Sequence, residues 1–356
     1  MLTISVFGGG SVAHAVIAAA GSRGHRVRVC TRQPRSWLRI VSATLPNGNR
    51  IEGALDFATS DHRDALRDAD MALVCLPHCA RWKALMSMSR HLRPGMLVGA
   101  LPGFAGFTFA ARHILPKDTV IFGTQRIPFV ARKVKYGSEV EIRGIRRQTF
   151  LGASPAGKAR AVAHVFEAAL GVRTVPVPHL MNIELSPSNS VVNPARMYSL
   201  FNSPKRLLSG REEFFLDWDI QSSEILLRID ADLQASRRLL PRDTSFVAPI
   251  LLQYDACDAA HLTDQFRSLR SLAGRQVPVR GRGQARMDLA SAYVTEDLDH
   301  GLPVLHEILK KAGAEASSLT SILQWRRGLG PCAPTPAEQD LVSNFKDIEA
   351  ACQAID

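Results

Sequence analysis

After Met1 the sequence reads Leu2-Thr3-Ile4-Ser5-Val6-Phe7-Gly8-Gly9-Gly10-Ser11-Val12-Ala13. The apolar run up to Phe7 predicts a buried strand, and the small residues of 11–20 predict a helix directly after it. At this junction Gly8 permits a tight turn, Gly10 lets the backbone approach a pyrophosphate, and Ala13 lets the helix lie close to the sheet. Such glycines can be purely structural, but a GxGxxA pattern between strand and helix predicts a dinucleotide site. Its expected cofactor-binding residues are Gly8, Gly10, Ser11, Val12 and Ala13.

The end of the second predicted strand, residues 26–30, indicates which dinucleotide would bind. NAD-preferring sites carry an Asp or Glu about 20 residues after the glycines, where it accepts a hydrogen bond from the ribose 2′-OH. The residues that follow the strand here are Thr31-Arg32-Gln33-Pro34-Arg35, without a carboxylate. Arg32 and Arg35 can bind a 2′-phosphate, to which Thr31 can donate. We therefore expect NADP(H) to be preferred over NAD(H), unless both arginines are simply solvated loop residues.

Strand and helix patterns alternate up to about residue 180, which predicts a parallel sheet covered by helices. Pro46-Asn47-Gly48 predicts a hairpin turn. Leu76 is the last residue of a predicted strand and Pro77 follows it. We expect both to contact the cofactor. The expected strands cover residues 2–7, 26–30, 42–45, 50–53, 71–76, 96–101, 119–123 and 173–175, and the expected helices cover 11–20 and 156–170.

Beyond residue 180 helical periodicity dominates. The predicted fold is therefore α/β plus all-α, with a Rossmann-type dinucleotide-binding domain at 1–180 and an all-helical domain at 181–356. The expected helices of the second domain cover 221–239, 259–272, 304–312, 317–325 and 337–354.

Positive charge is concentrated in the first half of the chain. The 356 residues include 44 Lys and Arg against 33 Asp and Glu, a net charge of +11. Residues 1–180 hold 25 basic and 10 acidic side chains, whereas residues 181–356 hold 19 basic and 23 acidic ones. The basic residues form no Lys/Arg-rich block, so we interpret most of them as solvated surface and expect no nucleic-acid partner.

Six scattered cysteines without a CxxC pair predict reduced, mostly buried thiols and favour a cytoplasmic location. No run of about 20 apolar residues predicts a membrane span, and no basic segment precedes the uncharged N-terminus as in an export signal. We expect neither a metal site nor a membrane partner. The assembly state is open, a homodimer being one option.

Two segments of the second half carry a family resemblance. One contains Pro187-Ser188-Asn189 and, further on, Arg196-Met197-Tyr198; the other reads Tyr293-Val294-Thr295-Glu296-Asp297, with Gly301-Leu302 after it. Together with the glycine loop, they resemble the octopine/nopaline (opine) dehydrogenase family over nearly the whole chain. The resemblance implies that the amine of an amino acid condenses with a 2-oxo acid and that NAD(P)H reduces the resulting imine. Both small molecules are the implied partners.

The resemblance also implies site residues, with three departures. Family members pair a His with the Asp of the Thr-Glu-Asp run as an acid/base dyad; Asp297 is present, but Asn193 takes the place of the His and does not titrate. Ala292 replaces an Arg that pairs with a substrate carboxylate, and Phe104 stands where polar side chains are common. The implied catalytic residues are Asp297 and Asn193. The expected substrate-binding residues are Asn189, Arg196, Tyr198, Phe104, Arg126 and Tyr293.

Several residues could compensate for these departures. Arg126 and Arg132 follow the last strand of the predicted sheet, where the carboxyl ends of parallel strands open a cleft, although simple surface exposure is as plausible. The Thr295-Glu296-Asp297 run could instead cap the start of a helix. The candidate substitutes for the missing proton donor are Tyr198, Tyr293, His179 and His300.

Two other functions stay open. Ketopantoate and glycerol-3-phosphate reductases share similar domains and use a catalytic Lys, for which Lys205 is the nearest candidate here, in a loop unlike their motif. A non-catalytic NADP(H)-binding sensor or regulatory protein is the alternative that Asn193 favours.

Overall fold

The computed structural model describes residues 1–202, 208, 211–281 and 286–356. The chain divides into two compact units, one formed by Met1–Glu184 with Gln353–Asp356 and the other by Leu185–Cys352. The C-terminal residue is tied into the first unit, because Ser154 Oγ donates to the Asp356 carbonyl at 2.6 Å and His179 pairs with the Asp356 carboxylate.

The first unit is built on an eleven-stranded mixed sheet in the order β11-β10-β7-β6-β5-β1-β2-β4-β3-β9-β8. Strands β1, β2, β4, β5, β6 and β7 run parallel, whereas β3 is antiparallel to β4 and β10 is antiparallel to β7. The predicted α/β domain and its 45–50 hairpin are thereby confirmed. The strands are β1 (Thr3–Phe7), β2 (Arg26–Cys30), β3 (Ile40–Thr44), β4 (Arg50–Thr59), β5 (Met71–Val74), β6 (Leu97–Ala100), β7 (Val120–Thr124), β8 (Phe129–Lys135), β9 (Glu139–Ile145), β10 (Gln148–Ser154) and β11 (Arg173–Pro176).

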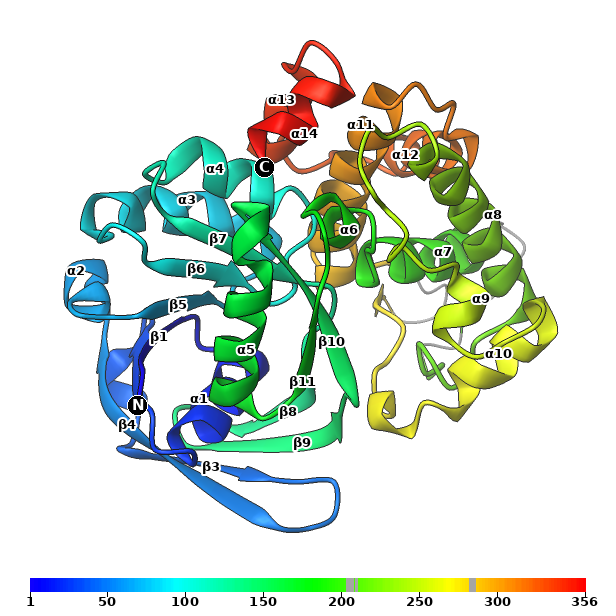
Figure 1. The fold of residues 1–356 in the computed structure, drawn as a ribbon. Coiled ribbons are helices and arrows are strands. Elements are labelled where there is room, and N and C mark those ends of the chain that lie inside the picture. The colour runs from blue at the N-terminus through cyan, green and yellow to red at the C-terminus, as the bar shows by residue number, and fades with distance from the viewer. Residues whose placement is uncertain (203–207, 209–210, 282–285) are drawn as a thin grey trace. The chain divides into compact units, whose positions relative to one another are not determined.

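Helices cover both faces of this sheet (Figure 1): α1 and α5 lie on one face, and α2, α3 and α4 lie on the other. The small residues of α1 let it approach β4 closely, since a Cβ on Gly21 would lie 2.7 Å from the Cα of Gly53. The helices are α1 (Ser11–Gly21), α2 (His62–Leu66), α3 (His78–Met88), α4 (Phe107–Ile114), α5 (Ala159–Leu170) and α6 (Met181–Glu184).

Strands β8, β9 and β10 were not predicted from the sequence. The strand β8 lies at an edge of the sheet, and its residues 132–135 are exposed and mostly basic, so the apolar signal of a buried strand is absent. The parallel pairing of β9 with β3 places the β8–β9 hairpin beside α1.

The second unit is mainly helical, as predicted, but it also holds a two-stranded sheet that the all-helical prediction did not include. The predicted single helix over 337–354 is wrong: Asp347 caps a second helix by accepting from the Ala350 N–H at 2.8 Å. The elements of this half of the chain are α7 (Asn189–Phe201), α8 (Ile220–Arg237), α9 (Ile250–Gln253), α10 (Ala259–Ser268), β12 (Val279–Arg280), β13 (Arg286–Met287), the π-helix η5 (Tyr293–Gly301), α11 (Leu302–Lys311), α12 (Ser317–Gly328), α13 (Ala337–Ser343) and α14 (Ile348–Ala354).

The cysteines are all free, but only half of them are buried. The expectation of mostly buried thiols is therefore wrong for Cys79, Cys257 and Cys332, which are exposed. No helix in the described part of the chain is both long and apolar enough to cross a membrane.

Candidate functional site

The glycine loop leaves room for an anion at the N-terminus of α1. Gly8 has φ +131°, and a Cβ there would lie 2.5 Å from the Cys75 carbonyl oxygen, so the tight turn requires glycine. Around Gly10, by contrast, no described atom outside the neighbouring backbone lies within 4 Å of the place a Cβ would take. The first turn of α1 also has no acidic residue and no side-chain cap. The first-turn N–H groups and the open space above them fit the pyrophosphate of a dinucleotide.

The residues after β2 lie at the surface. Thr31 is half-buried, whereas Arg32 and Arg35 are exposed. The Thr31 Oγ1 lies 2.8 Å from the Tyr136 Oη, which comes from the turn of the β8–β9 hairpin. No local sequence pattern predicts this contact, because the two residues are 105 positions apart.

A buried histidine connects the glycine loop to that hairpin. His14 Nε2 accepts a hydrogen bond from the Gly137 N–H at 2.8 Å, so the ring proton sits on Nδ1 and is donated to the Gly10 carbonyl at 2.8 Å. Burial lowers the pKa of His14, in keeping with this neutral form. Its ring also packs against Trp37 at a tilted angle, with the ring centroids 4.3 Å apart.

Two buried charged side chains organise the loops after β5 and β6. Arg81 Nε donates to the Leu76 carbonyl at 3.2 Å, and its Nη1 donates to the Phe104 carbonyl at 3.0 Å, which ties the two loops together. The Glu184 carboxylate accepts from the Gly106 N–H at 2.9 Å and from the Thr108 N–H and Oγ1 at 3.0 and 2.5 Å. Burial raises the pKa of Glu184. Neither residue was identified from the sequence.

The predicted residues on these loops occupy different environments. Leu76 and Pro77 follow β5 at the carboxyl edge of the parallel strands, as expected for a cofactor contact. Phe104 is buried, with its ring centroid 5.5 Å from that of His78. Arg126, after β7, is buried and donates to the Gln125 carbonyl at 3.1 Å, so its interpretation as an exposed surface residue is wrong.

In the second unit, α7 and η5 bring together the two predicted catalytic residues. The Asn193 Nδ2 donates to the Asp297 Oδ2 at 2.8 Å, although the residues are 104 positions apart. Only 3% of Asn193 and 5% of Asp297 are exposed. Asn193 Oδ1 is buried and has no hydrogen-bond partner among the described residues. The pair therefore presents one unsatisfied acceptor beside a carboxyl group.

Burial raises the pKa of Asp297 to about 8; the Asn193 hydrogen bond opposes this shift and the Glu296 charge adds to it. At neutral pH the carboxyl group is therefore mostly protonated and can donate a proton. Asp297 lies inside a π-helix that continues into α11, so its interpretation as a helix cap is wrong. π-Helical turns recur at functional sites because they shift side chains out of the regular helical register.

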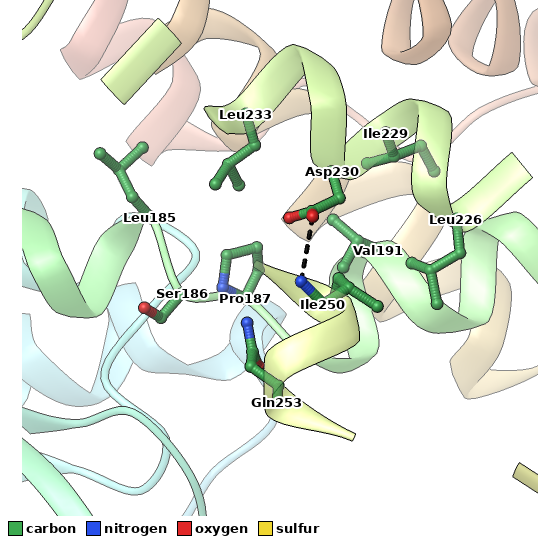
Figure 2. Close-up of a pocket in the computed structure, with 10 residues that line it drawn as sticks. All are labelled: Leu185, Ser186, Pro187, Val191, Leu226, Ile229, Asp230, Leu233, Ile250 and Gln253. Carbon is green, nitrogen blue, oxygen red and sulfur yellow. Dashed lines mark hydrogen bonds between the residues drawn. The ribbon is translucent and has the colours of Figure 1, made fainter. Parts of the chain in front are cut away.

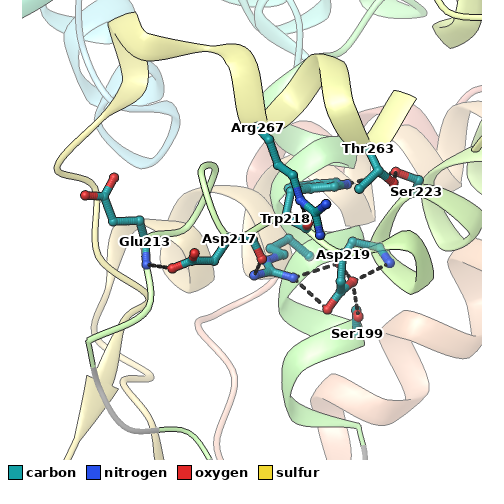
Figure 3. Close-up of polar contacts among 10 residues, drawn as sticks. Ser199, Glu213, Asp217, Trp218, Asp219, Ser223, Thr263 and Arg267 are labelled. Atoms are coloured by element: carbon teal, nitrogen blue, oxygen red, sulfur yellow. Dashed lines mark hydrogen bonds and ion pairs between the residues drawn. The ribbon is translucent and has the colours of Figure 1, made fainter. Parts of the chain in front are cut away.

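Arg196 is engaged within the helical unit. Its guanidinium lies 2.8 Å from the Asp219 carboxylate and 5.7 Å from the centre of the Trp218 ring. Asp219 also accepts from Ser199 Oγ at 3.1 Å and caps α8 through the Ser222 N–H at 2.8 Å (Figure 3). This network neutralises the Arg196 charge inside the unit. The contacts of Arg196 therefore do not support its predicted role in binding substrate.

The remaining predicted residues lie on the same helices. Asn189 is exposed at the start of α7, and the half-buried Tyr198 packs edge-on against Trp325 at 5.1 Å. Tyr293, on η5, stacks on Phe214 at 4.2 Å, and burial raises its pKa. His300 is buried 3.5 Å from Glu338. The candidate Lys205 lies outside the described residues.

A small cavity of about 10 Å³ lies within the helical unit (Figure 2). One of its polar groups, the Asp230 carboxylate, is bonded to the Ile250 N–H at 3.0 Å. A cavity of this size holds about one water molecule, so it is no substrate site. Among the described residues, no group of three or more His, Cys, Asp or Glu side chains is arranged to hold a metal ion. The cavity is lined by Leu185, Ser186, Pro187, Val191, Leu226, Ile229, Asp230, Leu233, Ile250 and Gln253.

Two family models match the chain. Residues 176–329 match the α-helical domain of NAD/NADP octopine/nopaline dehydrogenase, and residues 3–102 match a coenzyme F420-dependent NADP oxidoreductase. Among curated proteins, the tauropine dehydrogenase of Arabella iricolor is 22% identical and aligns with 92% of this chain and 91% of its own.

Solved structures share the fold. Octopine dehydrogenase with NADH and L-arginine covers 99% of this chain and 98% of its own, at 20% identity and a TM-score of 0.82. Yersinopine dehydrogenase with bound NADP⁺ covers 96% of this chain and 98% of its own, at 11% identity and a TM-score of 0.70. The first unit is thus an NAD(P)-binding domain, and related folds hold either dinucleotide.

Proposed function

Because the chain belongs to the octopine/nopaline (opine) dehydrogenase family, we propose that it joins the amine of an amino acid to a 2-oxo acid and reduces the imine. The product is a secondary amine that carries both carboxylates. NAD(P)H supplies the hydride when bound, and the residues that would hold it are those of the glycine loop and the ends of β2 and β5.

The buried pair of Asn193 and Asp297 carries this proposal. When an amine attacks a 2-oxo acid, a C–N bond forms and the former carbonyl oxygen becomes a hydroxyl group that must leave. Protonated Asp297 donates a proton to this oxygen, the C–O bond breaks, and water departs. The resulting C=N carbon accepts the hydride, which completes the secondary amine.

Asn193 holds and orients this acid. Its Nδ2 fixes the Asp297 carboxyl, and its unsatisfied Oδ1 can accept a hydrogen bond from the substrate amine. Because an amide does not titrate, Asp297 carries the proton transfer alone, unlike in a His–Asp dyad.

The cofactor of this reaction is proposed to be NADPH in preference to NADH. Arg32 and Arg35 are exposed beside Thr31, as cation-rich 2′-phosphate sites require, and no carboxylate follows β2. Calorimetric titration of the purified protein tests this choice. Tighter binding of NADH than of NADPH would contradict it.

Turnover is tested by supplying purified protein with NADPH and panels of amino acids and 2-oxo acids, and following nicotinamide absorbance. We expect at least one pair to be turned over, and Asp297→Asn to lower the rate by about 10²- to 10⁴-fold. Glu296→Gln is the matched control, since it removes a carboxylate from the same π-helix; it is expected to keep turnover while lowering the Asp297 pKa, because the Glu296 charge contributes to raising it.

The replacement of the family His by Asn193 favours one other function, that of a non-catalytic NADP(H) sensor. Tight NADPH binding without turnover on any substrate pair, unchanged by Asn193→His, would favour the sensor over the enzyme.

A further inference from the structure

We propose that the β8–β9 hairpin completes the adenosine end of the cofactor site, with Lys133 and Tyr136 contacting the 2′-phosphate of NADP(H). This inference rests on the NADP(H) preference proposed above. It adds residues that lie about 100 positions beyond the glycine loop and the end of β2.

Tyr136 is placed between the two segments that flank the adenosine ribose in a dinucleotide-binding domain. Its Oη lies 2.8 Å from the Thr31 Oγ1, directly after β2. A Cβ on Gly9 would lie 2.5 Å from the same Oη. In GxGxxA domains the group after β2 contacts the ribose 2′ substituent. The Tyr136 hydroxyl is therefore positioned to donate to that substituent.

Lys133 brings a cation to the same place. Its Nζ lies 5.0 Å from the centre of the Tyr136 ring. Its backbone N–H donates to Ser11 Oγ at 3.0 Å, which attaches β8 to the first residue of α1. The Lys133 charge also contributes to lowering the pKa of His14, behind the larger effect of burial. An exposed ammonium group beside the glycine loop suits a phosphate.

The acidic residues of β9 lie opposite other cations, Glu139 opposite Lys135 and Glu141 opposite Arg132, whereas Lys133 lies opposite Val140. The first acidic residue of the chain is Glu52. Asp61, whose charge affects Cys30 at the end of β2, accepts from the Arg63 N–H at 2.7 Å and caps α2. Lys133 and the exposed Arg32 thus offer two cations to a dianionic phosphate.

The hairpin turn is held rigidly, so its side chains are preorganised. Tyr136 packs edge-on against Trp37, with centroids 5.6 Å apart, and the following Gly137 donates to His14. Gly137 has φ +79°, and its carbonyl accepts from the Leu38 N–H at 3.0 Å. A site already ordered before binding loses little conformational entropy when the phosphate arrives.

Binding of 2′,5′-ADP and of 5′-ADP, measured by calorimetry without substrate, tests the inference. We expect Lys133→Ala to weaken 2′,5′-ADP by about tenfold, as for a hydrogen bond to a charged group, and 5′-ADP by less than about twofold. Tyr136→Phe keeps the ring packing and is expected to act in the same direction by a smaller factor. Lys158→Ala, an exposed lysine before α5, controls for the loss of one positive charge.

Each outcome has a distinct meaning. Equal weakening of both nucleotides by Lys133→Ala would place the lysine elsewhere on the cofactor and overturn the inference, as would no change in either. If the unmodified protein binds 2′,5′-ADP no more tightly than 5′-ADP, the proposed NADP(H) preference itself fails. Melting curves of each variant identify any loss that is due to unfolding.

Discussion

The amide of Asn193 and the carboxyl of Asp297 meet at 2.8 Å, buried between the proline-containing helix α7 and the π-helix η5. Asparagine in this place leaves the carboxyl group as the titrating member of the pair. Because burial raises the Asp297 pKa to about 8, the group is poised to change protonation near physiological pH.

The rate of the reductive reaction should fall as the pH rises through about 8, because Asp297 then loses the proton that it donates. Oxidation of the product should show the opposite dependence, since that direction needs the carboxylate. Initial rates of NADPH consumption and formation between pH 6 and 10 measure both limbs. A reductive rate that keeps rising above pH 9 would argue against Asp297 as the acid.

The free energy of unfolding should also depend on pH through the titration of Asp297. The native pKa of Asp297, about 8, lies above its ordinary value of 3.8, so the native state binds the proton more tightly than the unfolded chain does. This contribution is complete below about pH 4 and is lost as the pH rises through about 8, at up to about 1.4 kcal/mol per pH unit.

Asp297→Asn should remove this pH dependence of the unfolding free energy. The stability of the variant relative to the unmodified protein should therefore be greater at pH 9 than at pH 5. Urea unfolding at both pH values, compared between the two proteins, isolates this group from all others that titrate. An identical difference at both pH values would show that burial does not raise this pKa.

Gly8 and Gly10 should respond differently to alanine. Gly8→Ala forces a side chain into a left-handed backbone and against the Cys75 carbonyl, so we expect destabilisation by about 2 kcal/mol or more. Gly10→Ala meets no described atom and starts from φ −87°, so its stability should change by less than about 1 kcal/mol.

Cofactor affinity should nevertheless collapse in Gly10→Ala, because the new methyl group enters the space left for the pyrophosphate. Melting temperature and NADPH titration of both variants test the contrast. Unchanged NADPH affinity in a folded Gly10→Ala protein would place the dinucleotide elsewhere.

Glu184→Ala should destabilise the first unit by about 3 kcal/mol, because it leaves the buried N–H groups of Gly106 and Thr108 without their acceptor. Thr108→Val is the matched comparison; it removes only the hydroxyl bond and should cost about 1 kcal/mol. Denaturant unfolding measures both. Equal effects would mean that the backbone contacts of Glu184 contribute little.

Local pattern was sufficient for much of the fold. The strand–glycine–helix junction at residues 2–20, the parallel strands and the switch to helices near residue 180 are encoded in short-range periodicity, and the structure confirms them as elements. The prediction of a single helix over 337–354 was wrong because one capping residue, Asp347, starts a new helix despite the continuous helical periodicity of the sequence. Strand β8 was missed because an edge strand need not be apolar on either face; β9 and β10 are interior strands, to which this reason does not apply.

The family resemblance was enough to predict the candidate catalytic pair, but not the protonation state of its carboxyl group. Asp297 is an ordinary acidic residue in the sequence, and only its burial in the fold raises its pKa to about 8. Arg81 and Glu184 were missed because nothing near them in the sequence reveals that their partners are backbone groups of distant loops.

Residues 2–13 alone thus specify a glycine-rich turn suited to a dinucleotide, since every atom of that turn lies within a dozen residues. Contacts that depend on strand order and register were set by the tertiary structure alone. Tyr136 reaches Thr31 only because β9 pairs with β3, and Asn193 reaches Asp297 only because η5 packs on α7. Desolvation and long-range pairing are properties of the packed chain, so no local pattern of residues carries them.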